Sequence, residues 1–327
     1  MSAELEPEQI RPGLWCIPMP MPGPLRATLA YAVLADDGVH LIDPGWDTSE
    51  NAERLGRVLT GLGRSAAEIR TVVVTHHHPD HIGLAARLRR DHGVRVVLSQ
   101  VEREVLSVVA DPAHRDLETY RQRLEGWGVP AARQPELVDS HASIAPAVAV
   151  EPDGILRDGD VVRLGERMLT VLLTPGHTGG HVCLVDDADE VIFTGDHVLP
   201  EVYAGIGLGI LPGTEPVGAL IASLDRLAPY DDYEVLPGHG HRFRDLGARR
   251  RRIAAHHLRR LAEIATLVPE LGDAPVWEYA ARLTWTLGWE GLRGFARHSA
   301  LHQTELHLRA LGTHGADALV ARGLSSG

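Results

Sequence analysis

The sequence predicts an α+β domain over residues 1–245, followed by a small helical domain over residues 246–327. The first part mixes short apolar runs with amphipathic helical stretches, whereas the last part shows helical patterns only. The charge changes at nearly the same place: residues 1–240 carry 19 arginines against 36 acidic residues (−17), and residues 241–327 carry 13 against 8 (+5). A length of 327 residues also suits one large domain with an appendage.

The first part begins as a β-meander and continues as an alternation of strand, helix and strand. Thr48 is a candidate helix N-cap, and Gly63 would end that helix. The valine-rich run at 69–75 is continuous, as expected of a central strand that is covered on both faces. Strands are expected at 14–17, 28–34, 39–42, 69–75, 94–98, 161–164, 168–173, 182–185, 191–194 and 234–236.

Residues 100–150 are harder to assign than the segments around them. They combine helical charge patterning with a proline- and alanine-rich stretch, and we expect an insertion over one edge of the core. The last helices have apolar stripes that suit the packing of a small helical domain. Helices are expected at 48–63, 82–90, 215–227, 246–268, 274–287 and 300–311.

The composition excludes several kinds of chemistry. All 32 basic residues are arginine, which rules out Schiff-base catalysis, the P-loop lysine and the serine–lysine hydrolases. Cys16 and Cys183 lie far apart in apolar runs, so neither a disulfide framework nor a thiolate metal site is expected. The polar, acidic N-terminus and the lack of a long apolar run predict a cytoplasmic protein without a membrane segment.

The strongest chemical signal is the segment at 75–81, THHHPDH, which ends an expected strand and precedes an expected helix. In an extended chain His76 and His78 point to the same side and can ligate one metal ion. Asp80 and His81 follow where the chain turns into the helix, and they can face a second ion beside the first.

Three further candidates, His177, Asp196 and His239, stand next to glycine just after apolar strands. Glycine lets backbone loops converge closely, and loops at strand ends are where layered folds place function. Each residue alone is most simply a polar loop residue, but five histidines and two aspartates recurring at strand ends indicate a metal site. Imidazole nitrogen and carboxylate oxygen suit zinc, with iron or manganese as alternatives.

In this order the residues resemble the metallo-β-lactamase fold superfamily. Its H-x-H-x-D-H signature matches at residues 76–81, and its later His, Asp and His match His177, Asp196 and His239. The resemblance covers about residues 14–245 and implies a four-layer αββα sandwich with a dinuclear site at one edge of the two sheets. It also implies that the C-terminal helices form a winged-helix-like domain, as in one subgroup of the superfamily.

The resemblance assigns a role to each matching residue. Two divalent ions per chain, zinc foremost, are the implied cofactors, and water deprotonated between them would attack as a metal-bound hydroxide. Asp80 would be catalytic, holding this nucleophile or accepting its proton. Asp43 and His181 would support the ligands from behind. The implied ligands are His76, His78 and His177 for the first ion, Asp80, His81 and His239 for the second, and Asp196 as the bridge.

Weaker features border the expected site. The glycine-rich stretch at 197–213 could bring Tyr203 to a substrate oxygen, and a packed tyrosine in a flexible connection is an equal alternative. His197 matches a position that is often polar in the superfamily. His77 should point away from His76 and His78.

Hydrolysis of a small-molecule ester or thioester is the favoured function, as in the glyoxalase II-like branch of the superfamily. The alternative is a phosphodiesterase or endoribonuclease with the same metals, because the arginines at 249–252 open the helix after the last ligand. RNA is the less favoured partner, since the −17 charge of the first 240 residues opposes a polyanion. A third hypothesis is a structural metal site in a partner-binding or homodimeric protein, and the fourth is β-lactam hydrolysis.

Overall fold

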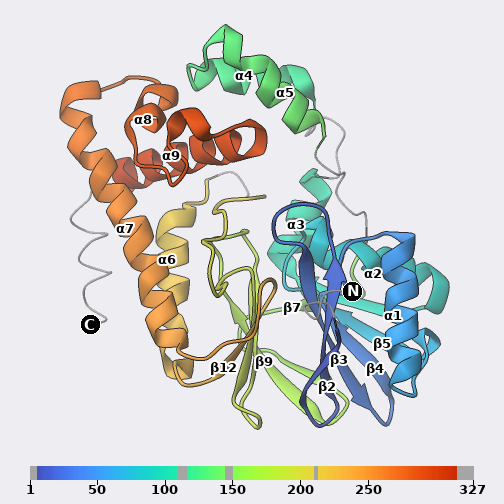
Figure 1. Cartoon of the computed structure of the whole chain (residues 1–327). Helices are drawn as coiled ribbons and strands as arrows, with labels where there is room; N and C mark the ends of the chain where they lie inside the picture. Colours follow the sequence, from blue (N-terminus) through green and yellow to red (C-terminus); the bar gives the residue numbers. More distant parts are fainter. Residues whose placement is uncertain (1–5, 110–115, 144–149, 210–212, 315–327) are drawn as a thin grey trace.

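Two β-sheets lie face to face, and helices cover the outer side of each (Figure 1). The structure is a computed structural model that describes residues 6–109, 116–143, 150–209 and 213–314. One sheet has seven strands in the order β1-β2-β3-β4-β5-β6-β7, and the other has five in the order β12-β11-β10-β9-β8. The αββα prediction is therefore confirmed.

The seven-stranded sheet starts as an antiparallel meander and becomes parallel from β4 onward. All five residues of β4 are buried, which agrees with a strand covered on both faces. Its strands are β1 (Glu8–Arg11), β2 (Leu14–Pro20), β3 (Ala27–Ala35), β4 (Gly38–Ile42), β5 (Ile69–Val73), β6 (Arg95–Ser99) and β7 (Gly154–Leu156).

The five-stranded sheet is antiparallel except for the pair β11 and β12. Because β9 and β11 both run antiparallel to β10, these two strands are parallel in direction, and their carboxyl ends lie on the same side of the sheet. Its strands are β8 (Val161–Leu164), β9 (Arg167–Leu173), β10 (Val182–Asp186), β11 (Val191–Gly195) and β12 (Glu234–Pro237).

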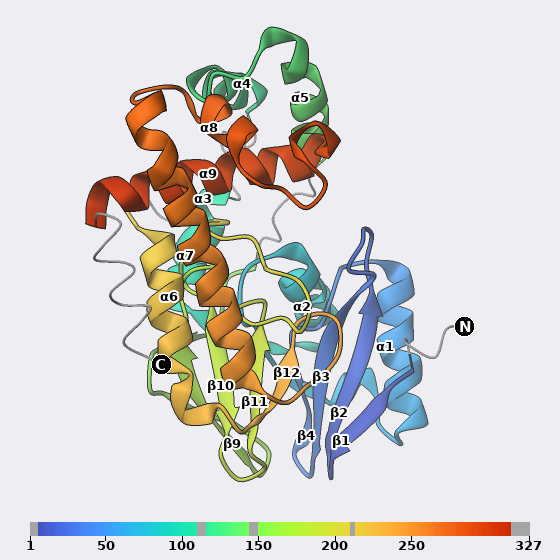
Figure 2. The ribbon, with the colours of Figure 1, turned by 60° about the vertical axis from the view of Figure 1, so that its left-hand side comes forward.

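Three apolar clusters hold the layers together. One joins the seven-stranded sheet to α1 (Ser49–Gly61) and α2 (Pro79–His92), and a second fills the space between the sheets. The third packs α6 (Pro216–Arg226) and α7 (Leu246–Leu271) on the five-stranded sheet, as Figure 2 shows from the side.

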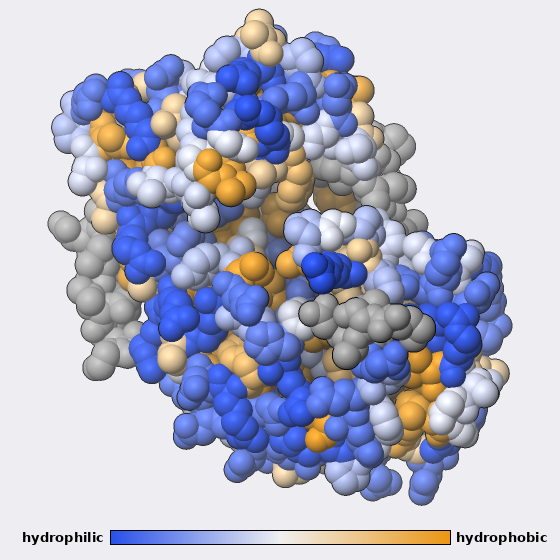
Figure 3. All heavy atoms as spheres, viewed as in Figure 1, coloured by the Kyte–Doolittle hydropathy of each residue, from blue (hydrophilic) through white to orange (hydrophobic). Residues whose placement is uncertain are grey.

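On the outside, the face seen in Figure 3 is mainly hydrophilic, and its hydrophobic residues form small separate groups. Within the described residues, no helix has both the length and the apolar character needed to cross a membrane.

The insertion and the C-terminal helices form one unit, which we call the helical module. It consists of α4 (Leu117–Gly126), α5 (Gln134–Ala142), α8 (Val276–Arg282) and α9 (Gly294–His314), and lies beyond the end of the sandwich (Figures 1 and 2). Its shared core includes Leu124 and Trp127 from the insertion together with Ala280 and Leu301. The 100–150 stretch is therefore divided: α3 (Gln100–Val109) packs on the core of the seven-stranded sheet through Leu106, whereas α4 and α5 pack against the C-terminal helices and do not cover the core.

Details of the C-terminal part also differ from expectation. The helix expected at 274–287 ends at Arg282, because the backbone of Leu283 is extended (ψ 153°). Between residues 246 and 314 the structure contains helices and no strand, so this range shows no wing of a winged-helix domain. Residues 315–327 lie outside the described part.

Candidate metal centre

The predicted ligand residues lie on four loops that meet at one edge of the sandwich. The segment with His76 and His78 follows β5, and His78 is the N-cap of α2, whose first turn contains Asp80. Proline at the first helical position suits this sharp entry, since its missing N–H is not needed there. The other loops follow β9, β11 and β12 and carry His177, Asp196 and His239.

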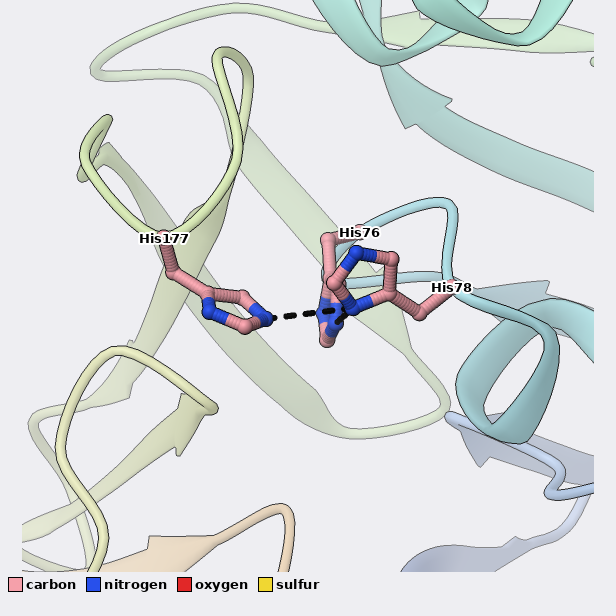
Figure 4. A group of neighbouring side chains, drawn as sticks. All are labelled: His76, His78 and His177. Carbon is pink, nitrogen blue, oxygen red and sulfur yellow. Dashed lines mark hydrogen bonds between the residues drawn. The ribbon is translucent and has the colours of Figure 1, made fainter. Parts of the chain in front are cut away.

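Three imidazoles converge in the first group, which Figure 4 shows. His78 Nδ1 lies 3.0 Å from His76 Nε2 and 3.1 Å from His177 Nε2. Nitrogen atoms this close from three separate rings form a compact donor set. His76 and His177 are buried, so the protein itself shields this set from solvent.

A second group combines two imidazoles with a carboxylate. His239 Nε2 lies 3.3 Å from His81 Nε2 and 3.2 Å from Asp80 Oδ2. The distance between His81 Nε2 and Asp80 Oδ2 is 3.6 Å. The mixed nitrogen and oxygen donors again suit zinc, iron or manganese.

Asp196 lies between the two groups. Its Oδ1 is 3.4 Å from both His81 Nε2 and His239 Nε2, while its Oδ2 is 3.6 Å from His177 Nε2. Oδ1 is buried and, among the described residues, makes no hydrogen bond. A buried carboxylate oxygen without a partner is costly unless a cation satisfies it. The residues therefore fit the binding of divalent metal, with Asp196 placed between the two donor groups.

Backbone carbonyls orient two of the ligand rings. His177 Nδ1 lies 2.6 Å from Gly205 O, and His239 Nδ1 lies 2.8 Å from Ala27 O. Because a carbonyl oxygen can only accept, Nδ1 carries the proton in each ring and donates it. In the neutral form of each ring, the form that can ligate a cation, the lone pair is then on Nε2, which is the atom that faces the site.

Asp43 orients two further ligands. Its Oδ2 accepts from His81 Nδ1 at 2.8 Å and from the Thr75 hydroxyl at 2.7 Å, while its Oδ1 accepts from Thr75 N at 2.8 Å. Since the Thr75 hydroxyl donates to Asp43, its oxygen can accept from His76 Nδ1, 3.0 Å away. One carboxylate therefore directs the Nε2 lone pairs of His76 and His81 into the site. Asp43 has a left-handed φ of 51°, and such strain is often found at functional sites.

The charges in the metal-free protein follow from burial and from neighbouring groups. Burial and the surrounding imidazoles hold the pKa values of His76 and His78 well below the ordinary value, so both rings are neutral and can ligate a cation. Burial alone would lower the pKa of His81, but Asp196 and Asp80 hold it well above its usual range. Burial would raise the pKa of Asp80, but His81 and His239 lower it to about 2, so this carboxylate is ionised at neutral pH.

His181 supports the bridging residue. The backbone N–H of Asp196 donates to His181 Nε2 at 3.2 Å, and His181 Nδ1 lies 2.9 Å from Thr174 Oγ1. Its placement behind Asp196 agrees with the supporting role implied by the resemblance. The neighbouring His197 is buried against the His181 ring, with 5.8 Å between the ring centres.

Tyr203 lies against α7, and its expected contact with a substrate oxygen stays a prediction. Its ring stacks on His256 of α7 at a centroid distance of 4.1 Å, and the Arg249 guanidinium lies 4.9 Å from its centre. The packed-tyrosine alternative describes this position, because the ring contacts α7.

Glu102, at the start of α3 (Gln100–Val109), is a buried carboxylate that the sequence analysis missed. It accepts from His77 N at 2.9 Å, from Thr178 Oγ1 at 2.6 Å and from Gly180 N at 2.7 Å. The His77 ring also bonds to it, so His77 Nδ1 is not turned toward the donor groups, although the ring centre lies 4.9 Å from that of His78. Glu102 thereby connects the loops that carry the first metal group. Its neighbours Arg103 and Glu104 are also charged, so nothing in the local sequence indicates that Glu102 is buried.

A cleft of about 500 Å³ adjoins the second group. His239 forms part of its wall, together with the β2–β3 turn and the loop after Asp196. The side chains that line it are mostly apolar, and the polar ones are those of Arg26, Glu201, His239 and His241. A larger cavity of about 730 Å³ lies around Arg167 and reaches none of the ligand residues.

Two curated proteins are similar to this chain. A hydroxyacylglutathione hydrolase of Bradyrhizobium sp. (strain BTAi1 / ATCC BAA-1182) is 28% identical over 214 residues, covering 64% of this chain and 64% of that protein. The acyl-coenzyme A thioesterase MBLAC2 of Homo sapiens is 33% identical over 195 residues, covering 57% of this chain and 61% of that protein. The chain thus matches less than two thirds of the length of these two relatives.

A solved structure matches over nearly the whole chain. The metallo-beta-lactamase family protein TTHA1429 from Thermus thermophilus superposes with a TM-score of 0.76 at 28% identity, covering 94% of this chain and 95% of that one. The model of the metallo-beta-lactamase superfamily matches residues 23–239, a range that contains every ligand residue proposed above. The chain belongs to the metallo-β-lactamase superfamily.

Proposed function

We propose that the protein hydrolyses a small-molecule thioester or ester with two divalent metal ions, zinc foremost. The observation that carries the proposal is the pair of donor groups that share Asp196, with ring nitrogens oriented inward by bonds on their outer side. When bound, the two ions would supply Lewis acidity and activate water as a nucleophile near neutral pH.

The protein's own residues have distinct tasks in this reaction. His76, His78 and His177 would hold one ion, and Asp80, His81 and His239 the other. Asp80 would hold the attacking water or accept its proton, because it is ionised and its side chain is 13% exposed, more than that of its neighbour His239. In the net reaction the water oxygen bonds to the acyl carbon, the carbon–sulfur bond breaks, and the released sulfur takes the proton.

The cleft beside His239 is the proposed place for the acyl group. Leu29 and Leu199 in its wall are buried, and Val202 at its rim is exposed, so an apolar group could replace water there. The reacting carbon would then lie next to the metal ligands.

The names of the two curated relatives favour a thioester over other electrophiles. An acyl-coenzyme A and an acylglutathione both join an acyl group to sulfur, although the two leaving groups differ. The common part of the two substrates is therefore the acyl–sulfur bond.

The nuclease alternative receives less support, because part of the arginine run is already engaged. Arg249 and Arg250 are buried; Arg249 donates to the carbonyl of Leu199 at 2.6 Å, and Arg250 forms an ion pair with Asp231 at 2.6 Å. Arg251 also lies 3.4 Å from Asp231. Arginines held in this way are poor contacts for phosphates.

The test is the metal content of the purified protein, together with turnover of a thioester panel and of a labelled RNA. We expect two metal ions per chain, thioester cleavage, and loss of both the metal and the activity in His76→Ala. His92→Ala, an exposed histidine at the end of α2, is the matched control and should change neither. RNA cleavage that falls steeply with salt would favour the nuclease, and a wild-type protein that binds no metal would overturn the site assignment.

Asp80→Ala separates catalysis from a structural role of the metals. For a catalytic site we expect thioester turnover to fall by about a hundredfold or more. A structural metal site predicts a change in metal content and stability only.

A further inference from the structure

The loop at 205–209 lies directly on the metal ligand His177. Gly207 N donates to Gly176 O at 2.8 Å, and Leu208 N donates to His177 O at 2.9 Å. Gly205 O accepts from the His177 ring at 2.6 Å. Three hydrogen bonds therefore fix both the backbone and the ring of His177 from this loop.

The other side of the same loop packs on α9 of the helical module. His302 Nε2 lies 3.1 Å from Gly207 O. A Cβ atom on Gly207 would come within 2.5 Å of Leu306 Cδ1, and the φ of Gly207 is 66°, so glycine is needed there. The loop is thus held between α9 and the ligand, and the positive φ favours glycine at 207.

His302 is itself held by the insertion. Arg123 of α4 donates to His302 Nδ1 at 2.8 Å and also pairs with Glu305 at 3.0 Å, while its guanidinium lies 4.5 Å from the centre of the Trp127 ring. Because arginine can only donate, Nδ1 of His302 accepts, and the ring proton is on Nε2. This tautomer is the one that donates to Gly207 O.

A continuous set of contacts therefore runs from α4 through His302 and the 205–209 loop to His177. We propose that His302 is a positioning residue for the metal site, and that the helical module serves the centre through it. His302 does not contact the ligand and acts through Gly207. The proposal rests on the metal-binding role proposed above for His177.

A role in packing alone would be the simpler explanation, and His307 on the same helix provides the comparison. Like His302 it is buried, but its Nδ1 bonds to Gln303 O within α9, and its Nε2 faces His257 of α7 at 3.3 Å. His302 and His307 therefore share the same helix, the same residue type and a buried position, and they differ in that only His302 contacts the 205–209 loop.

The experiment compares His302→Leu, His302→Gln and His307→Leu in the full-length protein. Zinc is titrated into each metal-free variant against a chromogenic chelator, and thermal unfolding and hydrogen exchange at the Leu208 amide are followed in parallel. We expect His302→Leu to weaken the binding of one of the two zinc ions by about 10-fold and to speed exchange at Leu208. His302→Gln should restore most of the affinity, because its amide can donate to Gly207 O and accept from Arg123.

His307→Leu should leave zinc affinity unchanged, even where it lowers the unfolding temperature. Equal zinc affinities in wild type and His302→Leu, or equal losses in His302→Leu and His307→Leu, would overturn the proposal. If His302→Leu fails to fold, His302→Asn, whose amide is too short to reach Gly207 O, takes its place with the same expected loss. A wild-type protein that binds no zinc would instead refute the proposed metal site.

Discussion

Asp43→Asn tests the idea that one carboxylate sets the tautomers of two ligands. Asparagine has nearly the same shape and tolerates the left-handed φ of 51° at this position, so the backbone should be retained. The Thr75 N–H can still bond to the remaining oxygen. The new NH2 group, however, would face the Thr75 hydroxyl and His81 Nδ1, which now donate to Oδ2 at 2.7 and 2.8 Å.

The consequence for the ligands follows from which groups can donate a hydrogen bond and which can only accept one. An amide N–H facing His81 Nδ1 favours the tautomer with the proton on Nε2, which is the metal-facing nitrogen. The Thr75 hydroxyl, no longer able to donate to residue 43, would donate to His76 Nδ1 and shift that ring in the same direction. Loss of such a supporting contact reduces metal affinity by about 10- to 100-fold, or about 1.4 to 2.7 kcal/mol.

The assay is competition between the protein and a chelator for zinc at pH 7.5. Asp153→Asn is the matched control, because Asp153 also accepts a backbone N–H, that of Val96 at 2.9 Å, and lies away from the ligands. We expect a weaker affinity in Asp43→Asn only. An affinity within threefold of wild type would refute the proposed tautomer control.

Two further predictions concern stability. Glu102→Gln replaces a buried carboxylate that accepts several hydrogen bonds with an amide that donates on one side. We therefore expect the free energy of unfolding in urea to fall by about 3 kcal/mol. The control, Glu104→Gln at an exposed position on the same helix, should change it little. Equal urea concentrations at the midpoint of unfolding for the two variants would contradict the stabilising role of the Glu102 hydrogen bonds. Burial, together with the charge of Arg260, lowers the pKa of His307 to about 4 from the ordinary 6.5, so the unfolded chain takes up the proton first as the pH falls. The free energy of unfolding is therefore not reduced by this group above about pH 6.5, and it falls as the pH drops from about 6.5 to about 4. At pH 5 the loss is about 2 kcal/mol. His307→Leu should flatten this part of the plot of unfolding free energy against pH.

Much of the fold and the ligand set could be predicted because the signals are local. Largely apolar runs identified β4, β10 and β11, since a strand covered on both faces shows no polar alternation. The run at 69–75 also identified β5, although Arg70 in this strand is exposed, so β5 is covered on both faces only in its second half. The spacing at residues 76–81 places donors on one side of a short extended segment, and this depends only on backbone geometry. The helix boundaries at the C-terminus were less accurate, because the extended backbone of Leu283 ends α8 at a position where the sequence has neither glycine nor proline.

By itself, the sequence therefore determined the layered architecture, the family resemblance and the residues able to hold metal. Only the tertiary structure decided which atoms face the site, that Glu102 connects its loops, that Tyr203 packs on α7, and that the insertion joins the C-terminal helices. The physical reason is sequence distance. Arg123 and His302 are 179 residues apart, and no local periodicity records that their side chains meet. Such contacts depend on how complete elements pack, which no short segment specifies.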